Sequence, residues 1–167
     1  MTISQTAEYA LRAVVWLGGH CDSALGTAEI ARATRVPAGY LAKVLQSLNR
    51  AGLVLSAPGR NGGVRLARPP AEISVLDVVN AIDPIKRIRR CPLGIGSHSG
   101  KLCPLHQRLD RAIGLMEQAF AECMIADLLT EPAAIEPLCQ PAGVTTPAPA
   151  KDAWLYGDFS SSSHTGS

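Results

Sequence analysis

The stretch TAEIARATRVPAGYLAKVLQSLNRAGLVLSAPGRNGGVRL, residues 27–66, decides the fold that we expect for this chain. Apolar residues at helical spacing predict a short helix from Thr27, which is expected to cap it, and a longer helix that ends near Gly52. Pro37 separates them, because proline disfavours helix at the residue before it and suits the first turn of the next helix. The longer helix has an apolar inner face: Leu41, Val44, Leu45 and Leu48. Two short helices joined by a tight turn are typical of a helix-turn-helix.

A glycine-rich hairpin is predicted immediately after these helices. Residues 53–55 are apolar and are predicted to form a strand, and residues 64–67 alternate apolar and polar side chains as a paired strand does. The sequence between them, Pro58-Gly59-Arg60-Asn61-Gly62-Gly63, supplies the positive φ angles of a hairpin turn. A helix-turn-helix followed by a basic hairpin predicts a winged helix, which is a mainly α-helical fold with a small β wing.

Two further helices complete the predicted winged helix-turn-helix domain, residues 1–84. The first has Ser4 as its expected N-cap and a stop at Gly18, which is followed by a second glycine. The second is expected to be capped by Ser74 and to end near Asp83, just before a proline.

A long amphipathic helix is predicted from Pro104 to about residue 129, within the segment 104–131. At about 1.5 Å per residue it would span roughly 40 Å. One stripe of it is apolar: Leu105, Leu109, Ile113, Met116, Phe120 and Cys123. No second helix of similar length is expected to cover this stripe, so we predict a homodimer through this C-terminal dimerisation helix. The alternative is that the stripe packs back on the winged helix.

Length and charge limit the class of protein. The 167 residues are enough for one domain with an appended element. Residues 1–90 carry twelve Lys or Arg against six Asp or Glu, whereas residues 91–167 carry four against eight. A basic first half favours an anionic partner, most often nucleic acid, and a solvated basic face is the alternative.

Composition also bears on location. No apolar run approaches the roughly eighteen residues of a membrane span, and the N-terminus lacks the pattern of a secretory signal. We therefore expect a cytoplasmic protein without a membrane partner. The odd number of cysteines, five, argues against a disulfide framework there. Residues 132–167 are rich in Pro, Ala, Thr, Ser and Gly and are predicted to form a disordered tail.

The winged helix predicts a DNA-binding surface. Its recognition helix is expected to enter the major groove with Tyr40, Lys43 and Gln46 pointing outward. Small residues at the helix start let backbone amides approach phosphate, and the wing can contact phosphate or the minor groove. Ordinary surface charge and a generic hairpin are the alternative explanations. The candidate DNA-binding residues are Thr27, Ala38, Gly39, Tyr40, Lys43, Gln46, Arg60, Asn61, Gly62 and Arg65.

A second candidate site lies in the unpatterned segment 85–103, for which we expect a loop. Long loops within compact domains are usually functional or disordered. The residues in and after it that suit zinc or an iron–sulfur cluster are Cys91, His98, Cys103 and His106. The basic run at residues 86–90 would favour the thiolate form of Cys91. The alternative is that the cysteines are small packed residues and the histidines lie on the surface.

Together these motifs resemble the Rrf-two family of bacterial winged-helix regulators, which includes IscR, NsrR and CymR. The resemblance covers roughly residues 1–130. It rests on ISQTAEYALR at 3–12, VPAGYLAK at 36–43, GRNGG at 59–63, ISVLDVV at 73–79 and CPLH at 103–106. The resemblance implies a homodimeric transcription factor that binds a palindromic operator in double-stranded DNA.

The resemblance further implies an iron–sulfur cluster in the loop before the dimer helix, whose state sets the affinity for DNA. Cys91 and Cys103 match the first and third of three family cysteines, and Ser97 stands where the second would be. His106 matches a histidine ligand of some members. Glu8 matches an acidic ligand that other members supply from the first helix of the partner subunit. The candidate ligands, of a [2Fe–2S] cluster or of zinc as the lesser alternative, are Cys91, Cys103, His106, His98 and Glu8.

Two regulatory mechanisms remain open. In the first, which we favour, a repressor or activator senses redox state, nitric oxide or iron–sulfur supply through the cluster, and repression is the expected mode. In the second, a cluster-free regulator is controlled by a partner protein, a ligand or oxidation of Cys91 and Cys103. An enzyme with Cys91 as nucleophile is disfavoured, because the sequence offers no matching base and orienting group.

Overall fold

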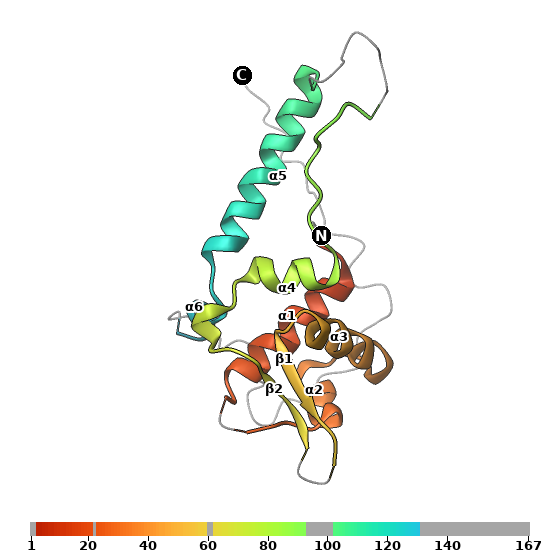
Figure 1. Ribbon diagram of the computed structural model, residues 1–167, viewed down its shortest axis with the longest axis vertical. Coiled ribbons are helices and arrows are strands. Elements are labelled where there is room, and N and C mark those ends of the chain that lie inside the picture. Colours follow the sequence, from red (N-terminus) through yellow and green to blue (C-terminus); the bar gives the residue numbers. More distant parts are fainter. Residues whose placement is uncertain (1–2, 22, 60–61, 93–101, 131–167) are drawn as a thin grey trace, which may run out of the picture.

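The architecture is a winged helix-turn-helix followed by a projecting helix, as seen in a computed structural model (Figure 1). The structure describes residues 3–21, 23–59, 62–92 and 102–130, so the predicted tail at 132–167 lies outside it. The elements in chain order are α1 (Gln5–Gly18), α2 (Thr27–Thr34), α3 (Ala38–Arg50), β1 (Val54–Ala57), β2 (Gly63–Leu66), the 3-10 turn η1 (Pro70–Glu72), α4 (Val75–Ile82), α5 (Pro104–Glu122) and α6 (Ile125–Thr130). This mainly α-helical fold with a small antiparallel sheet is the predicted one.

Helix α1 supplies one wall of the core. Ser4 caps it as predicted, because its Oγ accepts a hydrogen bond from the Ala7 amide at 3.2 Å. Ala10, Val14 and Leu17 follow at helical spacing and are fully or almost fully buried. They join the inner faces of α3, α4 and the sheet in one hydrophobic cluster. This shared core holds the helix-turn-helix and α4 together.

Helix α2 begins differently from the prediction. The expectation that Thr27 caps this helix is wrong: Thr27 is its first helical residue, and Gly26 occupies the cap position without a side-chain hydrogen bond. The reason lies in the neighbouring strand. Leu25 pairs with Val64 of β2 through two backbone hydrogen bonds of 2.9 and 2.8 Å. This pairing extends the backbone into Gly26, so the helix starts with Thr27 itself.

Helices α3 and α4 match their predictions closely. Helix α3 starts directly after Pro37, and a left-handed Gly52 follows its end with φ +70°. Ser74 caps α4 in a reciprocal capping box, in which Ser74 and Asp77 each accept a hydrogen bond from the other's amide at 3.0 Å. These local signals alone place both helices.

The wing is a two-stranded hairpin in which Val54 pairs with Leu66 and Ala57 pairs with Gly63. Strand β1 thus extends beyond the predicted residues 53–55. Gly63 is required where the hairpin passes the segment before α2, because a Cβ there would lie 2.8 Å from the Leu25 carbonyl oxygen. The tip of the wing, residues 60–61, lies outside the described residues.

The helix predicted from Pro104 to about residue 129 is interrupted. Helix α5 ends after 19 residues, which is about 28 Å at the usual rise, and Cys123 is extended with φ −91° and ψ 112°. The Cys123 carbonyl accepts from the Val75 amide at 2.9 Å, and the Ile125 amide donates to the Ile73 carbonyl at 2.8 Å. The prediction of one continuous helix is wrong, because these hydrogen bonds tie the chain to the start of α4.

The packing of α6 leads to a stability prediction. Ile125 is fully buried, so Ile125→Val is expected to lower the free energy of unfolding by about 1 kcal/mol. Leu55→Val also removes one carbon, from a residue of β1 that is 44% exposed. It should change the free energy of unfolding by less than about 0.5 kcal/mol. Urea denaturation of both variants measures the difference. Equal effects would contradict the inclusion of α6 in the core.

Helix α5 extends away from the winged domain, and residues 84–92 run beside it (Figure 1). The C-terminal end of α5 lies close to α4, and its N-terminal end lies at the tip of the molecule. Across the ranges that the structure describes, no helix combines the length and the apolar character needed to cross a membrane.

Candidate DNA-binding surface and metal centre

The outer face of α3 carries the predicted recognition residues. Tyr40, Lys43 and Gln46 are exposed, opposite the buried apolar face of the helix. The Tyr40 side chain is 56% exposed although it is aromatic. Ala38 and Gly39 are exposed at the helix start, and the space beside Gly39 is open. This face is therefore accessible to a ligand along its N-terminal half.

Tyr40 contacts a group of α1 side chains that is linked by ring contacts and hydrogen bonds. The sequence gives little indication of these contacts. The Tyr9 and Tyr40 rings meet edge to face with their centroids 6.1 Å apart. The Arg12 guanidinium lies 5.7 Å from the centroid of the Tyr9 ring. Arg12 also donates to Glu8 at 2.5 Å and to the Thr34 carbonyl at 3.3 Å. The only advance signal is the four-residue spacing of Glu8 and Arg12, which suits an ion pair on a helix.

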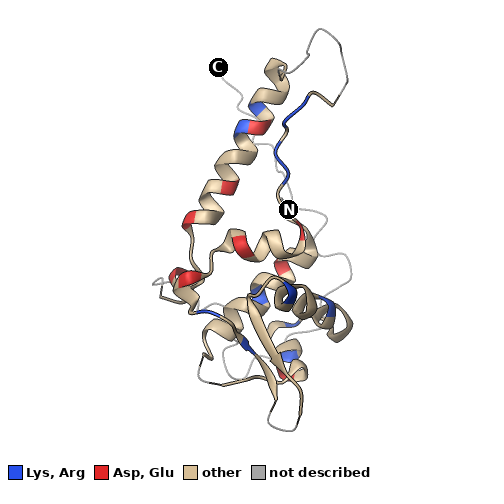
Figure 2. Ribbon diagram, in the orientation of Figure 1, with Lys and Arg blue, Asp and Glu red and all other residues tan. Residues whose placement is uncertain are grey.

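The wing and the start of α2 border the other side of α3. A surface hollow between them is lined by residues that include Thr27, Gln46, Asn49, Ser56 and Gly63. Asn49 and Ser56 are therefore added to the candidate set, and Arg65 is exposed nearby on β2. Arg60 and Asn61 lie outside the described residues. Figure 2 shows Lys and Arg on α3, on the wing strand and on the segment beside α5.

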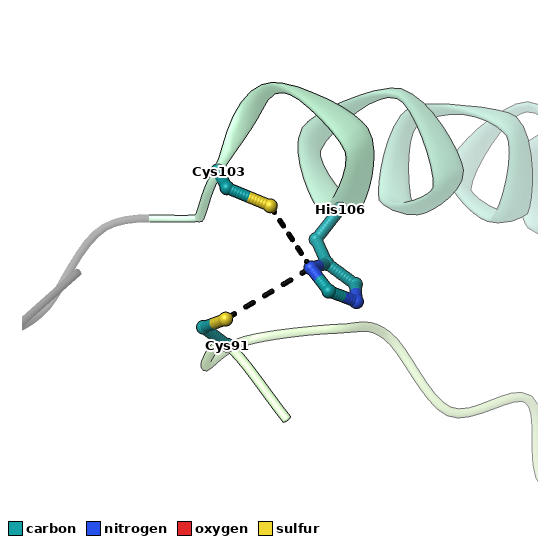
Figure 3. Close-up of side chains that lie close together, drawn as sticks. All are labelled: Cys91, Cys103 and His106. Atoms are coloured by element: carbon teal, nitrogen blue, oxygen red, sulfur yellow. Dashed lines mark hydrogen bonds between the residues drawn. The ribbon is translucent and has the colours of Figure 1, made fainter. Parts of the chain in front are cut away.

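Three side chains that could hold a metal converge where residues 84–92 meet the start of α5 (Figure 3). The ligand atoms of Cys91, Cys103 and His106 all lie within 4.8 Å of one another, and each residue is partly buried. His106 Nδ1 lies 3.1 Å from Cys103 Sγ and 3.9 Å from Cys91 Sγ. The sequence predicted one site from Cys91, His98, Cys103 and His106; the structure brings Cys91, Cys103 and His106 together, and His98 lies outside the described residues.

Local structure explains two of the three positions. Cys103 is the N-cap of α5, with an extended backbone, and Pro104 forms the first helical position. The Cys103 thiol makes no capping hydrogen bond, so its sulfur is not engaged with the backbone amides of the helix. His106 follows within the first turn, which brings its ring to the same side as Cys103.

The donor set fits a thiophilic metal or an iron–sulfur cluster. Two thiols and one imidazole supply three ligands, whereas zinc and a [2Fe–2S] cluster each take four. Ser97 and His98, which are near the missing position in the sequence, lie outside the described residues. Glu8 lies on α1 in an ion pair with Arg12, and is not part of the group that converges within this chain.

A second set of contacts lies beside the group formed by Cys91, Cys103 and His106. Arg87, from the basic run, turns to α5 and donates to Asp110 at 2.8 and 2.6 Å. These hydrogen bonds hold the pKa of Asp110 below its usual value and raise the pKa of the Arg87 guanidinium. Arg87 also reaches Glu117 at 3.4 Å. The sequence pattern that could have predicted this contact is the spacing of Asp110 and Glu117, which places them on the same helix face as His106.

The predicted dimer stripe divides into two parts. Leu105 and Leu109 are 62% and 46% exposed, and Leu115, which is not part of the predicted stripe, is 61% exposed. Ile113 and Met116 are partly buried and line a hollow between the start of α1, α4 and α5. The remaining two, Phe120 and Cys123, pack against the core of their own chain. The exposed large apolar residues of α5 thus lie between positions 105 and 115.

Comparison with known proteins connects these features. Residues 3–131 match the family Rrf2, described as iron-dependent transcriptional regulators. Protein aau3 of Rhizobium meliloti is 40% identical over 91 residues, which are 54% of this chain and 59% of that protein, so the match spans less than two thirds of that relative. A Mycobacterium tuberculosis protein named as an HTH-type transcriptional regulator is 35% identical over 130 residues, 77% of this chain and 81% of that protein.

Solved structures share the fold. T. potens IscR superposes with a TM-score of 0.64 at 22% identity, covering 77% of this chain and 86% of that chain. CymR, described as the global cysteine regulator of B. subtilis, superposes with a TM-score of 0.64 at 21% identity, covering 77% and 95%. The family match covers most of the chain, and the members are regulators rather than enzymes. This chain belongs to the Rrf2 family of DNA-binding transcriptional regulators.

Proposed function

We propose that this protein is a homodimeric transcriptional repressor whose affinity for a palindromic operator is set by an iron–sulfur cluster at Cys91 and Cys103. The observation that carries the proposal is the convergence of Cys91, Cys103 and His106 within 4.8 Å. The description of the family as iron-dependent supports it. Redox state, nitric oxide or iron–sulfur supply is the signal, because each acts on such a cluster.

A [2Fe–2S] cluster is the simplest occupant. Cys91 and Cys103 would provide thiolates, His106 would provide an imidazole, and a fourth ligand would come from His98 or from Glu8 of the partner subunit. When bound, the cluster supplies an oxidant-sensitive group whose histidine ligation also makes it sensitive to protonation. Glu8 would have to leave its ion pair with Arg12 to act as a ligand.

DNA binding uses the exposed face of α3. Tyr40, Lys43 and Gln46 reach base edges in the major groove, while Thr27 and Arg65 contact the phosphate backbone beside it. The ring contact of Tyr9 with Tyr40 gives α1 a direct effect on the position of the recognition side chain. Repacking of the segment 85–103 rotates one winged helix relative to its twin and changes the half-site spacing.

The dimer forms through α5. Leu105, Leu109 and Leu115 are exposed large apolar residues on this helix, and a second copy of the helix is the partner that covers them. The other residues of the predicted stripe are expected to contribute less to the dimer interface, because they already have contacts within their own chain. They are Ile113, Met116, Phe120 and Cys123. They would lie at the edge of the interface rather than at its centre.

A cluster-free regulator is the second candidate. The two thiols of Cys91 and Cys103 lie within 4.8 Å of each other, which favours control by reversible thiol oxidation. Control by a partner protein or ligand belongs to the same alternative. Zinc, the lesser alternative as occupant, would make the group a structural site.

Anaerobic purification followed by visible spectroscopy and by iron, sulfide and zinc analysis separates these possibilities. We expect absorbance in the visible range with iron and sulfide near stoichiometric amounts, and a change in DNA affinity when the cluster is oxidised or removed. Colourless, iron-free protein that still binds DNA would favour the cluster-free mechanism. One zinc per chain would instead assign a structural site.

A further inference from the structure

One face of α5 and its N-cap carries a row of residues that face the segment before it. Cys103, His106, Asp110, Gly114 and Glu117 follow one another at spacings of three and four, so they form a continuous row along the helix. Residues 84–92 run beside this row in the opposite direction (Figure 1). Residues 84–92 contain no helix or strand, so their position on α5 depends on individual contacts rather than on regular secondary structure.

Arg87 makes the strongest contacts between the two segments. Its guanidinium donates to both carboxylate oxygens of Asp110, at 2.8 and 2.6 Å, and to Glu117 at 3.4 Å. The backbone amide of Ile88 donates to the same Asp110 carboxylate at 2.9 Å. Asp110 therefore binds both a side chain and the backbone of the segment. These contacts determine where the segment lies along α5 and how close to the helix it lies.

Gly114 allows Arg87 to lie flat on the helix. A Cβ at this position would lie 3.0 to 3.2 Å from three atoms of the guanidinium, closer than ordinary contact. Glycine weakens a helix interior relative to alanine. Its presence here is consistent with a requirement for close approach of Arg87.

The contacts of Arg87 determine where Cys91 lies. Ile88 is held at Asp110, and His106 lies one helical turn before Asp110. Three residues after Ile88, Cys91 reaches His106, with Sγ 3.9 Å from Nδ1. A slip of the segment by one residue would move the thiol away from Cys103 and His106. The metal centre thus depends on the register of the segment.

We propose that Arg87 and Asp110 are positioning residues that hold Cys91 in register with Cys103 and His106, with Gly114 providing the space for the contact. This inference rests on the proposed metal-binding function. The Arg87 and Asp110 side chains are 37% and 20% exposed, and ion pairs at the surface contribute little to stability. The expected role is therefore geometric, and it is separable from folding.

Cobalt(II) titration of the anaerobic metal-free protein tests the proposal. Asp110→Asn and Arg87→Gln are each expected to weaken cobalt binding by about tenfold and to reduce the thiolate-to-cobalt charge-transfer band, because groups that orient metal ligands commonly have effects of this size. Arg111→Gln removes the same charge from an exposed position on α5, outside the basic run at residues 86–90, and should bind cobalt as the wild type does. The exchanged pair Arg87→Asp with Asp110→Arg should recover part of the loss.

Gly114→Leu separates positioning from folding. Leucine is a stronger helix former than glycine, so the thermal stability of the protein should be maintained or raised. Its side chain occupies the space of the guanidinium, so cobalt binding should weaken. A variant that lost stability and metal binding together would support a structural role instead, and would overturn the positioning role.

Cross-linking of metal-free protein with dibromobimane, which becomes fluorescent on joining two thiols, provides a readout independent of metal. Wild type should link Cys91 to Cys103, Cys91→Ser should not, and Asp110→Asn should do so more slowly. If the wild type binds no metal but Asp110→Asn still slows cross-linking, the metal function fails and the positioning role stands. If Asp110→Asn matches the wild type in both cobalt affinity and cross-linking, the positioning role is overturned.

Discussion

Cys103→Ala is expected to remove iron and sulfide from the anaerobically purified protein and to weaken cobalt(II) binding by at least about 100-fold. Loss of a group that only orients a ligand already costs about 10–100-fold in metal affinity, and loss of the ligand itself costs more. Cys103 is central to the site, since its Sγ lies 3.1 Å from His106 Nδ1. Metal analysis, the visible spectrum and a cobalt titration measure the effect.

Cys21→Ala is the matched control for this experiment. Cys21 is exposed after the end of α1, and its thiol donates to the Gly18 carbonyl at 2.8 Å, far along the chain from the metal centre. The Cys21→Ala variant should retain its iron and sulfide and should bind cobalt with wild-type affinity. Full iron occupancy in Cys103→Ala would place the cofactor outside the group formed by Cys91, Cys103 and His106, and would refute that part of the proposal.

Lys43→Glu is expected to weaken operator binding by about 100-fold or more. A single basic contact to DNA is typically worth about 1–3 kcal/mol, and reversal of the charge adds repulsion from the phosphates to the lost contact. In a dimer each operator complex loses two such contacts. Fluorescence anisotropy with a duplex selected from a random pool by the wild type measures the affinity, and the steep salt dependence expected of phosphate binding should become shallower.

Lys86→Glu controls for the change in net charge. Lys86 is exposed on the segment beside α5, away from α3, so its reversal should alter operator affinity far less. Both variants should keep the wild-type oligomeric state. If the two variants weakened DNA binding equally, net charge rather than the α3 face would explain the effect.

The parts of the fold that follow from neighbouring residues were predictable. Ser4 and Ser74 cap helices because their hydroxyls reach amides three residues away, and Pro37 starts α3 because its backbone suits a first helical turn. The pairing of Cys103 with His106 is of the same kind, since it depends on the geometry of one turn of helix.

Cys91 was predicted to belong to the same site from its residue type, but its position beside His106 could not be derived from neighbouring residues. Its approach to His106 depends on Arg87 and Asp110, which are 23 residues apart. A basic run next to a cysteine is compatible with several arrangements, because each arginine can face solvent, the thiol or another segment. The acidic partners on α5 become relevant only once the two segments lie side by side.

The sequence by itself determined the helix-turn-helix, the wing and the grouping of Cys103 with His106, because each is encoded within a turn or two of the chain. Only the tertiary structure decided that α5 ends before Cys123 and that Cys91 lies beside His106. Helix propensities differ by less than about 1 kcal/mol per residue among ordinary side chains. Burial of Ile125 contributes more, about 1.5–3 kcal/mol, and it requires the chain to leave the helix and pair with the start of α4.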